Sequence, residues 1–538
     1  MSVTREYDLG AAAARRGPAD LPDELDILVV GAGISGIGAA YRLLERDPDL
    51  DLAVLEARES SGGTWDLFRY PGVRSDSDMY SLSFPFRPWD REQSIADGAS
   101  ILEYLRETAA DSGIAERTYL GCSVVAASWS SQAQRWSVEV EGADGSARVV
   151  RARYVHLGSG YYDYDSPHDP GFVGVEDFAG EVVHPQHWPQ DLDLAGRRVV
   201  VIGSGATAVS LVPAAAQTAA SVTMLQRTPS YVIAVPASDR LVERLRRVLP
   251  PGPVQQVART KNVLVQRFLY VLSRVRPSAA RGIVLGALRR VLPQEVVDEH
   301  FTPPYDVWDQ RLCAVRDGDL FTAIRSGSVE VVTGHVDRFE HGGIRLQDGR
   351  LVEADVVVTA TGLRLKALGG IRLTVDDRAV DIGRTFAYRG LMLSGVPNMS
   401  MTVGYVNASW TLRADLVSGF VARLVHHMRE HGIGAAVPVA PEGMTPAPIL
   451  DLTSGYVQRA VGAFPKVGDR DPWTMEQSYM KDRRAFRAAD VTQDMHLVPL
   501  GAVGVHLPTG AAAPATVDLP GSSSNTDDSV GDLVEVRA

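Results

Sequence analysis

A strand that runs directly into a glycine-rich turn and then into a helix occurs early in the chain, in LDILVVGAGISGIGAAYRLLE at 25–45. The residues before the turn suit a buried parallel strand, and Gly31, Gly33 and Gly36 follow at G-x-G-x-x-G spacing. Gly31 permits the tight turn, Gly33 lets backbone approach a pyrophosphate, and Gly36 lets the helix pack on the strand. Glu56 ends the next strand at 56 − 36 = 20 residues, the spacing at which a carboxylate reaches ribose hydroxyls. The segment therefore predicts a Rossmann-like unit that binds a dinucleotide.

A second unit of the same kind, RRVVVIGSGATAVSLVPAAA, carries Gly203, Gly205 and Ala208 at the same offsets. Its next strand is followed by Arg227 and Thr228, where the first unit has its acid. A guanidinium and a hydroxyl suit a ribose that carries a 2′-phosphate, which an acid would repel. This unit therefore predicts an NADPH site, the alternative being an ordinary surface arginine after a strand.

Two dinucleotide sites with different preferences predict a flavoprotein in which FAD exchanges electrons with NADPH. The expected fold class is α/β, with two Rossmann-like domains, the second inserted in the first, and a helical insertion. A valine-rich strand at 356–360 is expected to return the chain to the FAD-binding domain. The expected ranges are a flexible N-terminus at 1–22, an FAD-binding domain at 23–185 and 355–500, an NADPH-binding domain at 186–354 with its helical insertion at 236–300, and a disordered tail at 501–538.

The segment FAGEVVHPQHWP, which connects the two units, carries a pattern of its own. It resembles F-x-G-x-x-x-H-x-x-x-W-P, the pattern of the type I Baeyer–Villiger monooxygenases, which are class B flavin monooxygenases. The block GGTWDLFRYPGVRSDSDMYSLSF is similar to the flavin-contacting segment of that family, and YDVWDQRLC and VGYVNASWTLRADL resemble its ethionamide-activating subgroup. The resemblance extends from about residue 26 to about residue 480. The pattern positions are Phe178, Gly180, His184, Trp188 and Pro189.

The resemblance implies a reaction and a site. One oxygen atom of O2 would enter next to a ketone carbonyl through a C4a-peroxyflavin, which gives an ester or a lactone. Arg311 matches the family's arginine, a fixed cation beside the oxyanion of the adduct, and Asp76 matches the carboxylate that pairs with it. The preceding position, often a lysine that faces the 2′-phosphate, is Gln310 here. This departure leaves more of the phosphate binding to Arg227 and Thr228.

The same matching assigns further cofactor contacts and a hinge. His184 and Trp188 are expected to link movement of the NADPH-binding domain to the flavin. The residues expected to contact FAD are Ser35, Thr64, Trp65, Asp66, Asp76 and Val124, and those expected to contact NADP are Arg74, Ser75, Ser204, Gly205, Ala206 and Thr207.

Other interpretations stay open at this point. Arg311 and Asp76 could form an ordinary surface ion pair. His184 and His187 could suggest a metal, but no cysteine or acid cluster completes a site, and we expect none. The substrate could be a thioether or thioamide that is oxygenated on sulfur or nitrogen instead of a ketone. A different class would be an NADPH oxidase that releases hydrogen peroxide, or a nucleotide-binding sensor.

Charge and hydropathy bear on partners and location. The net charge of -12 disfavours nucleic acid, no apolar run approaches the roughly 18 residues of a membrane span, and the start lacks the apolar stretch of a signal peptide. These features predict a cytoplasmic protein. Between Arg240 and Arg290, however, eleven arginines and one lysine stand against the single acid Glu243, a local balance of 12 − 1 = +11. This segment could be a solvated helical surface, a contact with an anionic membrane surface, or a cover over the substrate.

Overall fold

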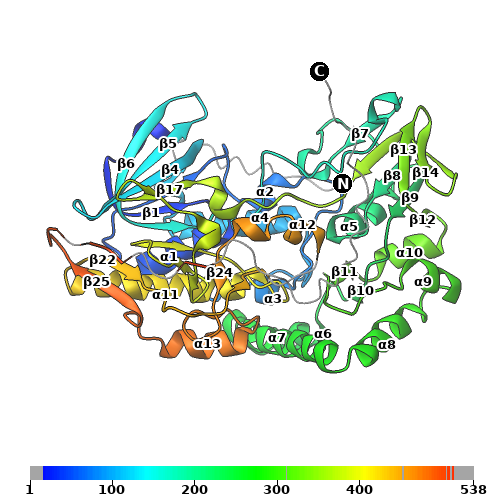
Figure 1. Ribbon diagram of the computed structural model, residues 1–538. Helices are drawn as coiled ribbons and strands as arrows, with labels where there is room; N and C mark the ends of the chain where they lie inside the picture. Colours follow the sequence, from blue (N-terminus) through cyan, green and yellow to red (C-terminus); the bar gives the residue numbers. More distant parts are fainter. Residues whose placement is uncertain (1–15, 311, 451–453, 505, 509–511, 514–538) are drawn as a thin grey trace, which may run out of the picture.

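The computed structural model describes residues 16–310, 312–450, 454–504, 506–508 and 512–513, and the statements below refer to these residues. Two lobes, each built on its own sheet, lie side by side, and a row of helices runs along the rim below them in Figure 1. Within the described chain, none of the helices combines the length and the apolar character needed to cross a membrane.

The first lobe is built on a mixed sheet with the strand order β18-β17-β4-β5-β6-β1-β2-β3, and β21 pairs with β6 outside this path. The central strands β1, β2 and β6 pair in parallel, as the first strand–turn–helix unit requires. The strands β4, β5 and β6 form an antiparallel meander whose side chains alternate between buried and exposed. The strands are β1 (Glu24–Val30), β2 (Leu52–Glu56), β3 (Thr118–Leu120), β4 (Cys122–Ser130), β5 (Arg135–Gly142), β6 (Ala147–Leu157), β17 (Arg372–Val375), β18 (Arg378–Ala379) and β21 (Met399–Met401).

Helices cover the first sheet and join it to the rest of the lobe. The helix α1 (Ile34–Arg46) follows the first glycine turn and packs along α11 (Trp410–Glu430), so that segments far apart in sequence form one layer. The helix α4 (Gly98–Asp111) packs against α1 and is capped at its N-terminus by Asp97, whose side chain accepts a hydrogen bond from the amide of Ser100. The apolar faces of these helices and of the sheet form the main core of the lobe.

The second lobe is built on a five-stranded sheet, β12-β9-β8-β16-β7, in which each pairing is parallel. The second glycine turn joins β8 to α5 (Ala206–Ala215), and α10 (Asp319–Arg325) packs beside α5. An antiparallel sheet, β13-β14-β15, lies at the outer edge of the lobe. The strands are β7 (Glu181–Val183), β8 (Arg198–Ile202), β9 (Ser221–Gln226), β12 (Val329–Thr333), β13 (Val336–Glu340), β14 (Gly343–Leu346), β15 (Leu351–Glu353) and β16 (Val356–Thr359).

Two strands lie in a different sheet from the one expected. We expected 181–185 and 355–360 to belong to the FAD-binding domain, but β16 pairs with β7 and β8 in the second sheet. A short run of buried valines suits any parallel sheet, so the local sequence does not reveal which sheet accepts it. We propose that the boundaries of the second domain lie before β7 and after β16.

The helical insertion at 236–300 forms four helices, α6 (Arg240–Leu245), α7 (Pro251–Val275), α8 (Pro277–Leu288) and α9 (Gln294–His300). The first half of α7 packs on α3 (Met79–Leu82) of the first lobe, although its chain neighbours belong to the second lobe. The carbonyls of Tyr80 and Ser83 accept hydrogen bonds from the guanidinium of Arg259 at 2.8 and 2.6 Å. The helical insertion therefore connects the two lobes.

Parts of both chain ends that were expected to be flexible or disordered contact the folded protein. Residues 1–15 and most of 501–538 lie outside the described residues. Leu21 is buried against the first sheet, and the backbone amide of the buried Ala513 donates to the carbonyl of Arg384 at 2.8 Å.

The remaining α-helices and strands are α2 (Thr64–Leu67), α12 (Gly455–Gln458), α13 (Tyr479–Ala488), β10 (Val232–Val235), β11 (Cys313–Arg316), β19 (Ala387–Tyr388), β20 (Met392–Leu393), β22 (Ile433–Pro438), β23 (Ala447–Pro448), β24 (Lys466–Val467) and β25 (Met495–Pro499).

Candidate active site

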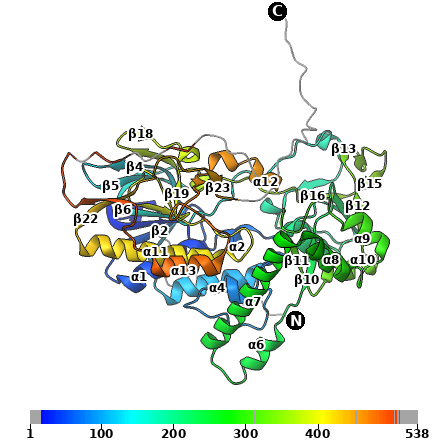
Figure 2. The ribbon, with the colours of Figure 1, turned by 60° about the horizontal axis from the view of Figure 1, so that its bottom comes forward.

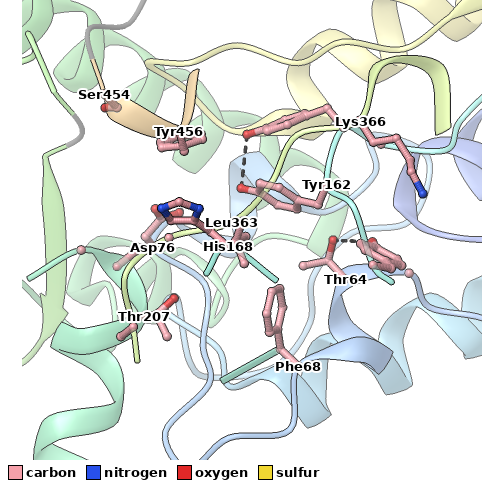
Figure 3. Close-up of a pocket in the computed structure, with 18 of the residues that line it drawn as sticks. Thr64, Phe68, Asp76, Tyr162, His168, Thr207, Leu363, Lys366, Ser454 and Tyr456 are labelled. Atoms are coloured by element: carbon pink, nitrogen blue, oxygen red, sulfur yellow. Dashed lines mark hydrogen bonds between the residues drawn. The ribbon is translucent and has the colours of Figure 1, made fainter. Parts of the chain in front are cut away.

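A cavity of about 1070 Å³ is lined by residues of both lobes. Its wall includes the residues that directly follow β1, β2, β8 and β9, which is where ligands bind in sheets of parallel strands. Figure 3 shows Thr64 and Phe68 on one side of this space and Asp76 and Thr207 on the other. The two glycine turns therefore open onto a common cavity.

The backbone of the first glycine turn leaves no room for a side chain at Gly31 or Gly36. Gly31 has φ +99°, and a Cβ atom there would lie 2.8 Å from the carbonyl oxygen of Gly158. A Cβ atom on Gly36 would lie 1.7 Å from the carbonyl oxygen of Gly31, so only glycine lets α1 start this close to β1. Gly33 and Ser35 line the cavity at the N-terminus of α1, where the helix dipole and the first amides favour an anion.

Glu56 is fixed at the end of β2, where it lines the cavity. Its Oε2 accepts a hydrogen bond from the amide of Ala32 at 2.9 Å, and its Oε1 accepts one from the amide of Arg58 at 3.1 Å. Burial raises the pKa of Glu56, and these two hydrogen bonds oppose the shift by favouring the carboxylate. The acid thus stands beside the first glycine turn, at the place expected for ribose recognition.

The second glycine turn repeats this geometry in the second lobe. Gly203 has φ +135°, and a Cβ atom there would lie 2.3 Å from the carbonyl oxygen of Ala360. A Cβ atom on Gly205, the N-cap of α5, would meet no atom within 4 Å. The approach to the start of α5 is therefore open to a phosphate. Ser204, Gly205, Ala206 and Thr207 line the cavity, whereas Ala208 is fully buried and lies outside its wall.

Arg227 and Thr228 follow β9 and line the cavity as well. The hydroxyl of Ser204 makes a 2.7 Å hydrogen bond with that of Ser230 and lies 3.3 Å from the carbonyl oxygen of Thr228, which ties the glycine turn to this segment. Because β12 pairs in parallel with β9, His335 beyond β12 reaches the same edge of the sheet and lines the cavity. His335 belongs to no recognisable motif, so the sequence alone does not predict its place in the site.

Arg74 connects the first lobe to the second at the cavity. Its side chain is buried, forms an ion pair with Asp319, and lies 3.4 Å from a backbone oxygen of α5. Arg74, Ser75 and Asp76 all line the cavity, as does Gln310. Arg311, which the resemblance pairs with Asp76, lies outside the described residues.

Thr64 and Trp65 stand at the start of α2 and line the cavity together with Val124 of β4. The hydroxyl of Thr64 makes a hydrogen bond of 2.9 Å with that of Tyr164, which is visible in Figure 3. These three predicted FAD contacts therefore lie on the first-lobe side of the cavity.

Asp66 differs from its expected role. Its side chain is fully buried and lies outside the cavity wall. The carboxylate accepts hydrogen bonds from Arg58 at 2.7 Å, Arg106 at 2.9 Å and Arg69 at 3.1 Å. Three guanidinium groups around one acid satisfy its oxygens, and one of them belongs to Arg58, which lines the cavity.

The residues of the FAGEVVHPQHWP pattern lie outside the cavity wall. Phe178 packs edge to face on Phe339, with ring centroids 6.0 Å apart. A Cβ atom on Gly180 would lie 2.3 Å from the carbonyl oxygen of Asp355, so the strand pairing of β7 with β16 needs glycine here. The start of the pattern therefore fixes the connecting segment to the second sheet.

The end of the pattern lies nearer the cavity. His184 Nε2 is 3.3 Å from the carbonyl oxygen of Gly362, which lines the cavity, and His184 Nδ1 accepts a hydrogen bond from the amide of Gln186 at 3.2 Å. Burial lowers the pKa of His184. Trp188, followed by Pro189, packs against the core of the second lobe. Within the described residues, no group of three or more His, Cys, Asp or Glu side chains gathers as a metal site.

Aromatic side chains that no sequence motif predicts form part of the cavity wall. The ring of Tyr161 lies 4.5 Å from that of Tyr162 and 5.0 Å from that of Trp410, measured between centroids. The indole of Trp410 donates a hydrogen bond of 2.8 Å to the hydroxyl of Ser35 at the first glycine turn. Tyr456 lies on the wall above Asp76 in Figure 3. The tyrosine-rich run after β6 was the available signal for this surface.

Comparisons with known proteins agree with this geometry. The sequence pattern of the family described as FMO-like, or flavin-binding monooxygenase-like, matches residues 25–367. The FAD-containing monooxygenase EthA of Mycobacterium tuberculosis is 49% identical over 477 residues, which cover 88% of this chain and 97% of the relative. The probable FAD-binding monooxygenase AlmA of Acinetobacter baylyi is 42% identical over 468 residues, 86% of this chain and 94% of the relative.

Solved structures share the fold. An oxidised steroid monooxygenase bound to NADP superimposes with a TM-score of 0.70 at 21% identity, over 88% of this chain and 100% of that chain. The open structure of cyclohexanone monooxygenase gives a TM-score of 0.69 at 20% identity, over the same shares. The expected α/β class with its parallel sheets is thereby confirmed. The chain belongs to the family of FMO-like flavin-binding monooxygenases.

Proposed function

We propose that this flavin monooxygenase inserts one oxygen atom of O2 next to a ketone carbonyl and so forms an ester or a lactone. The observation that carries the proposal is the common cavity, onto which a glycine turn with an acid and a glycine turn with an arginine both open. Two solved structures with this fold support it by their names: one is a steroid monooxygenase bound to NADP, and the other is a cyclohexanone monooxygenase, whose named compound is a ring ketone. The F-x-G-x-x-x-H-x-x-x-W-P pattern supports the same chemistry.

The residues of the first lobe fit FAD. The start of α1 offers amides to a pyrophosphate, and Glu56 offers a buried carboxylate to ribose hydroxyls. Thr64, Trp65 and Val124 would hold the remainder of the cofactor from the same side. When bound, FAD reduced by NADPH activates dioxygen, and the protein supplies orientation and charge.

The residues of the second lobe fit NADPH. The open start of α5 suits a pyrophosphate, and Arg227 with Thr228 suits a 2′-phosphate. Arg74 would face the nucleotide while its ion pair with Asp319 holds the two lobes in register. His335 adds an imidazole at the same edge of the sheet.

Arg311 and Asp76 would serve the oxygen transfer. A guanidinium held beside the substrate carbonyl stabilises negative charge that develops on its oxygen, and this needs no proton transfer. The carboxylate of Asp76, on the cavity wall, would orient that guanidinium. His184, hydrogen-bonded to the backbone of the cavity wall, would transmit movement of the second lobe.

Oxygenation of sulfur or nitrogen is the second candidate. YDVWDQRLC and VGYVNASWTLRADL resemble the ethionamide-activating subgroup, and ethionamide is a thioamide. A soft, electron-rich sulfur needs no cation beside a developing oxyanion, so this reaction would depend much less on Arg311.

The deciding experiment offers the protein, with FAD, NADPH and O2, an aryl ketone that also carries a thioether. Mass spectrometry with fragmentation locates the added oxygen. We expect oxygen beside the carbonyl, and we expect Arg311→Ala to retain FAD but lose ester formation by about 10²- to 10³-fold, while the exposed Arg325→Ala control keeps it.

Other outcomes point elsewhere. Oxygen on sulfur alone, equal in wild type and Arg311→Ala, would replace the ketone proposal by the second candidate. NADPH consumption with hydrogen peroxide as the sole product would make the protein an oxidase. Tight nucleotide binding without flavin reduction would make it a sensor.

A further inference from the structure

The long helix α7 carries both buried and exposed apolar side chains. Val254 and Ala258 are buried inside the molecule. Val257, Leu264, Phe268 and Val275 are 44%, 52%, 64% and 71% exposed. Their spacings of seven, four and seven residues place them on one side of the helix. The buried face is explained by packing inside the protein, and the exposed face is not.

Neighbouring segments extend this apolar surface. The hairpin of α6 and α7 projects from the body of the molecule in Figure 2. Its connecting turn carries Val248, which is 76% exposed, and Leu249, and α8 adds the exposed Ile283. Large exposed aliphatic side chains gathered on adjoining elements mark an interaction surface more often than scattered single ones do.

The same helices concentrate positive charge. Residues 240–290 have a balance of +11, so the rest of the chain carries −12 − 11 = −23. Within the described residues, Lys261, Arg274 and Arg289 form ion pairs with carboxylates. No ion pair is found there for the exposed Arg244 or Arg247 beside the apolar turn, nor for several other arginines of α7 and α8. The charge of this surface is therefore only partly neutralised.

We propose that α6, α7 and α8 form a docking surface for an anionic lipid bilayer. The exposed apolar side chains of α7 would lie in the membrane interface, and the arginines would contact lipid phosphates. Basic helices with an exposed apolar face bind such interfaces, because the two attractions act together. The helices would lie on the bilayer and not cross it, in line with their hydropathy. A second copy docked through the same surface would bring two positively charged surfaces together, which is unfavourable.

The test uses the full flavoprotein and measures its flotation with vesicles of pure phosphatidylcholine or of phosphatidylcholine with phosphatidylglycerol. We expect flotation with the anionic vesicles only, and its loss at high salt, because exposed charges are screened. Leu264→Glu with Phe268→Glu should abolish it, and each of Arg244→Gln and Arg247→Gln should weaken it about fivefold.

The matched control is Val149→Glu on β6, which changes an apolar side chain that is 55% exposed on the first lobe. This variant should float like the wild type, and all variants should keep bound FAD and NADPH-dependent flavin reduction. Flotation that ignores lipid charge, or that survives Leu264→Glu with Phe268→Glu, would overturn the proposal. So would a dimer by light scattering that these substitutions split while vesicles bind neither form, since the occupant would then be a second copy.

Discussion

Buried polar side chains hold specific parts of this protein together, and His156 is the clearest example. It is fully buried on β6, where its Nδ1 lies 2.8 Å from the hydroxyl of Ser400 and its Nε2 lies 3.2 Å from that of Thr402. Burial lowers the pKa of His156 to about 4 because the charged imidazolium loses its hydration. The neutral ring therefore links β6 to β21 and to the residue that follows it.

This arrangement predicts a stability that depends on pH. The pKa of His156 is lower in the folded than in the unfolded state, so the unfolded state binds more protons between pH 6.5 and about 4. Stability should fall as pH falls through that window, by about 1.4 kcal/mol for each unit. We expect His156→Gln to be less stable at neutral pH and to lose less on acidification. Tm measured from about pH 7.5 to about pH 5 checks this, and parallel pH profiles in both proteins would contradict it.

At the scale of elements, the strand–glycine–helix unit shows how a glycine in the local sequence allows α1 to lie close to β1. A Cβ atom on Gly36 would lie 1.7 Å from the Gly31 carbonyl oxygen and 3.4 Å from Val29 Cγ1. Both the oxygen and the helix backbone are rigid, so an added methyl group has to displace α1. The same displacement would move the amides at the start of α1 away from the cavity.

We therefore predict that Gly36→Ala destabilises the protein by about 3 kcal/mol or more and reduces its FAD content. The control is Gly282→Ala in α8, where a Cβ atom would meet no atom within 4 Å. That change should stabilise the helix by about 0.5 to 1 kcal/mol, because alanine loses less backbone entropy than glycine. Flavin absorbance and Tm of the purified variants decide the matter; Gly36→Ala with normal flavin content would refute the steric argument.

At the scale of the whole molecule, α7 connects the two lobes through buried polar contacts. The side chain of Gln255 accepts a hydrogen bond from the amide of Trp89 at 2.9 Å and donates to the carbonyl of Phe84 and the hydroxyl of Ser83, both at 3.0 Å. Each of these partners belongs to the first lobe. The orientation of the lobes around the common cavity therefore depends on a residue of the helical insertion.

Removing this contact should loosen the junction. We predict that Gln255→Ala lowers the free energy of unfolding by about 2 to 4 kcal/mol, because the Trp89 amide and the Phe84 carbonyl become buried and unpaired. Gln256→Ala, at the adjacent exposed position, should change it by less than about 0.5 kcal/mol. Thermal unfolding of the two variants tests this, and equal Tm values would show that the junction does not need Gln255.

The sequence anticipated the parts of the fold that rest on short, local patterns. The turns at Gly31 and Gly203, the acid at Glu56 and the arginine at Arg227 all border the cavity where their spacing places them. It did not anticipate that Asp66 is buried among three arginines, which lie up to 40 residues away in sequence, nor did it anticipate the aromatic wall. Such contacts join residues that are far apart in the sequence, and the periodicity of a short segment does not predict them.

The sequence by itself determined that this chain builds two nucleotide-binding units of unlike preference, because a glycine turn between strand and helix is encoded within one short segment. Only the tertiary structure decided which sheet receives β7 and β16, how Arg74 and α7 join the lobes, and which side of α7 stays exposed. One buried parallel strand resembles another in its local sequence, and so does one amphipathic helix another. Which elements they pack against therefore depends on the packing of the whole chain.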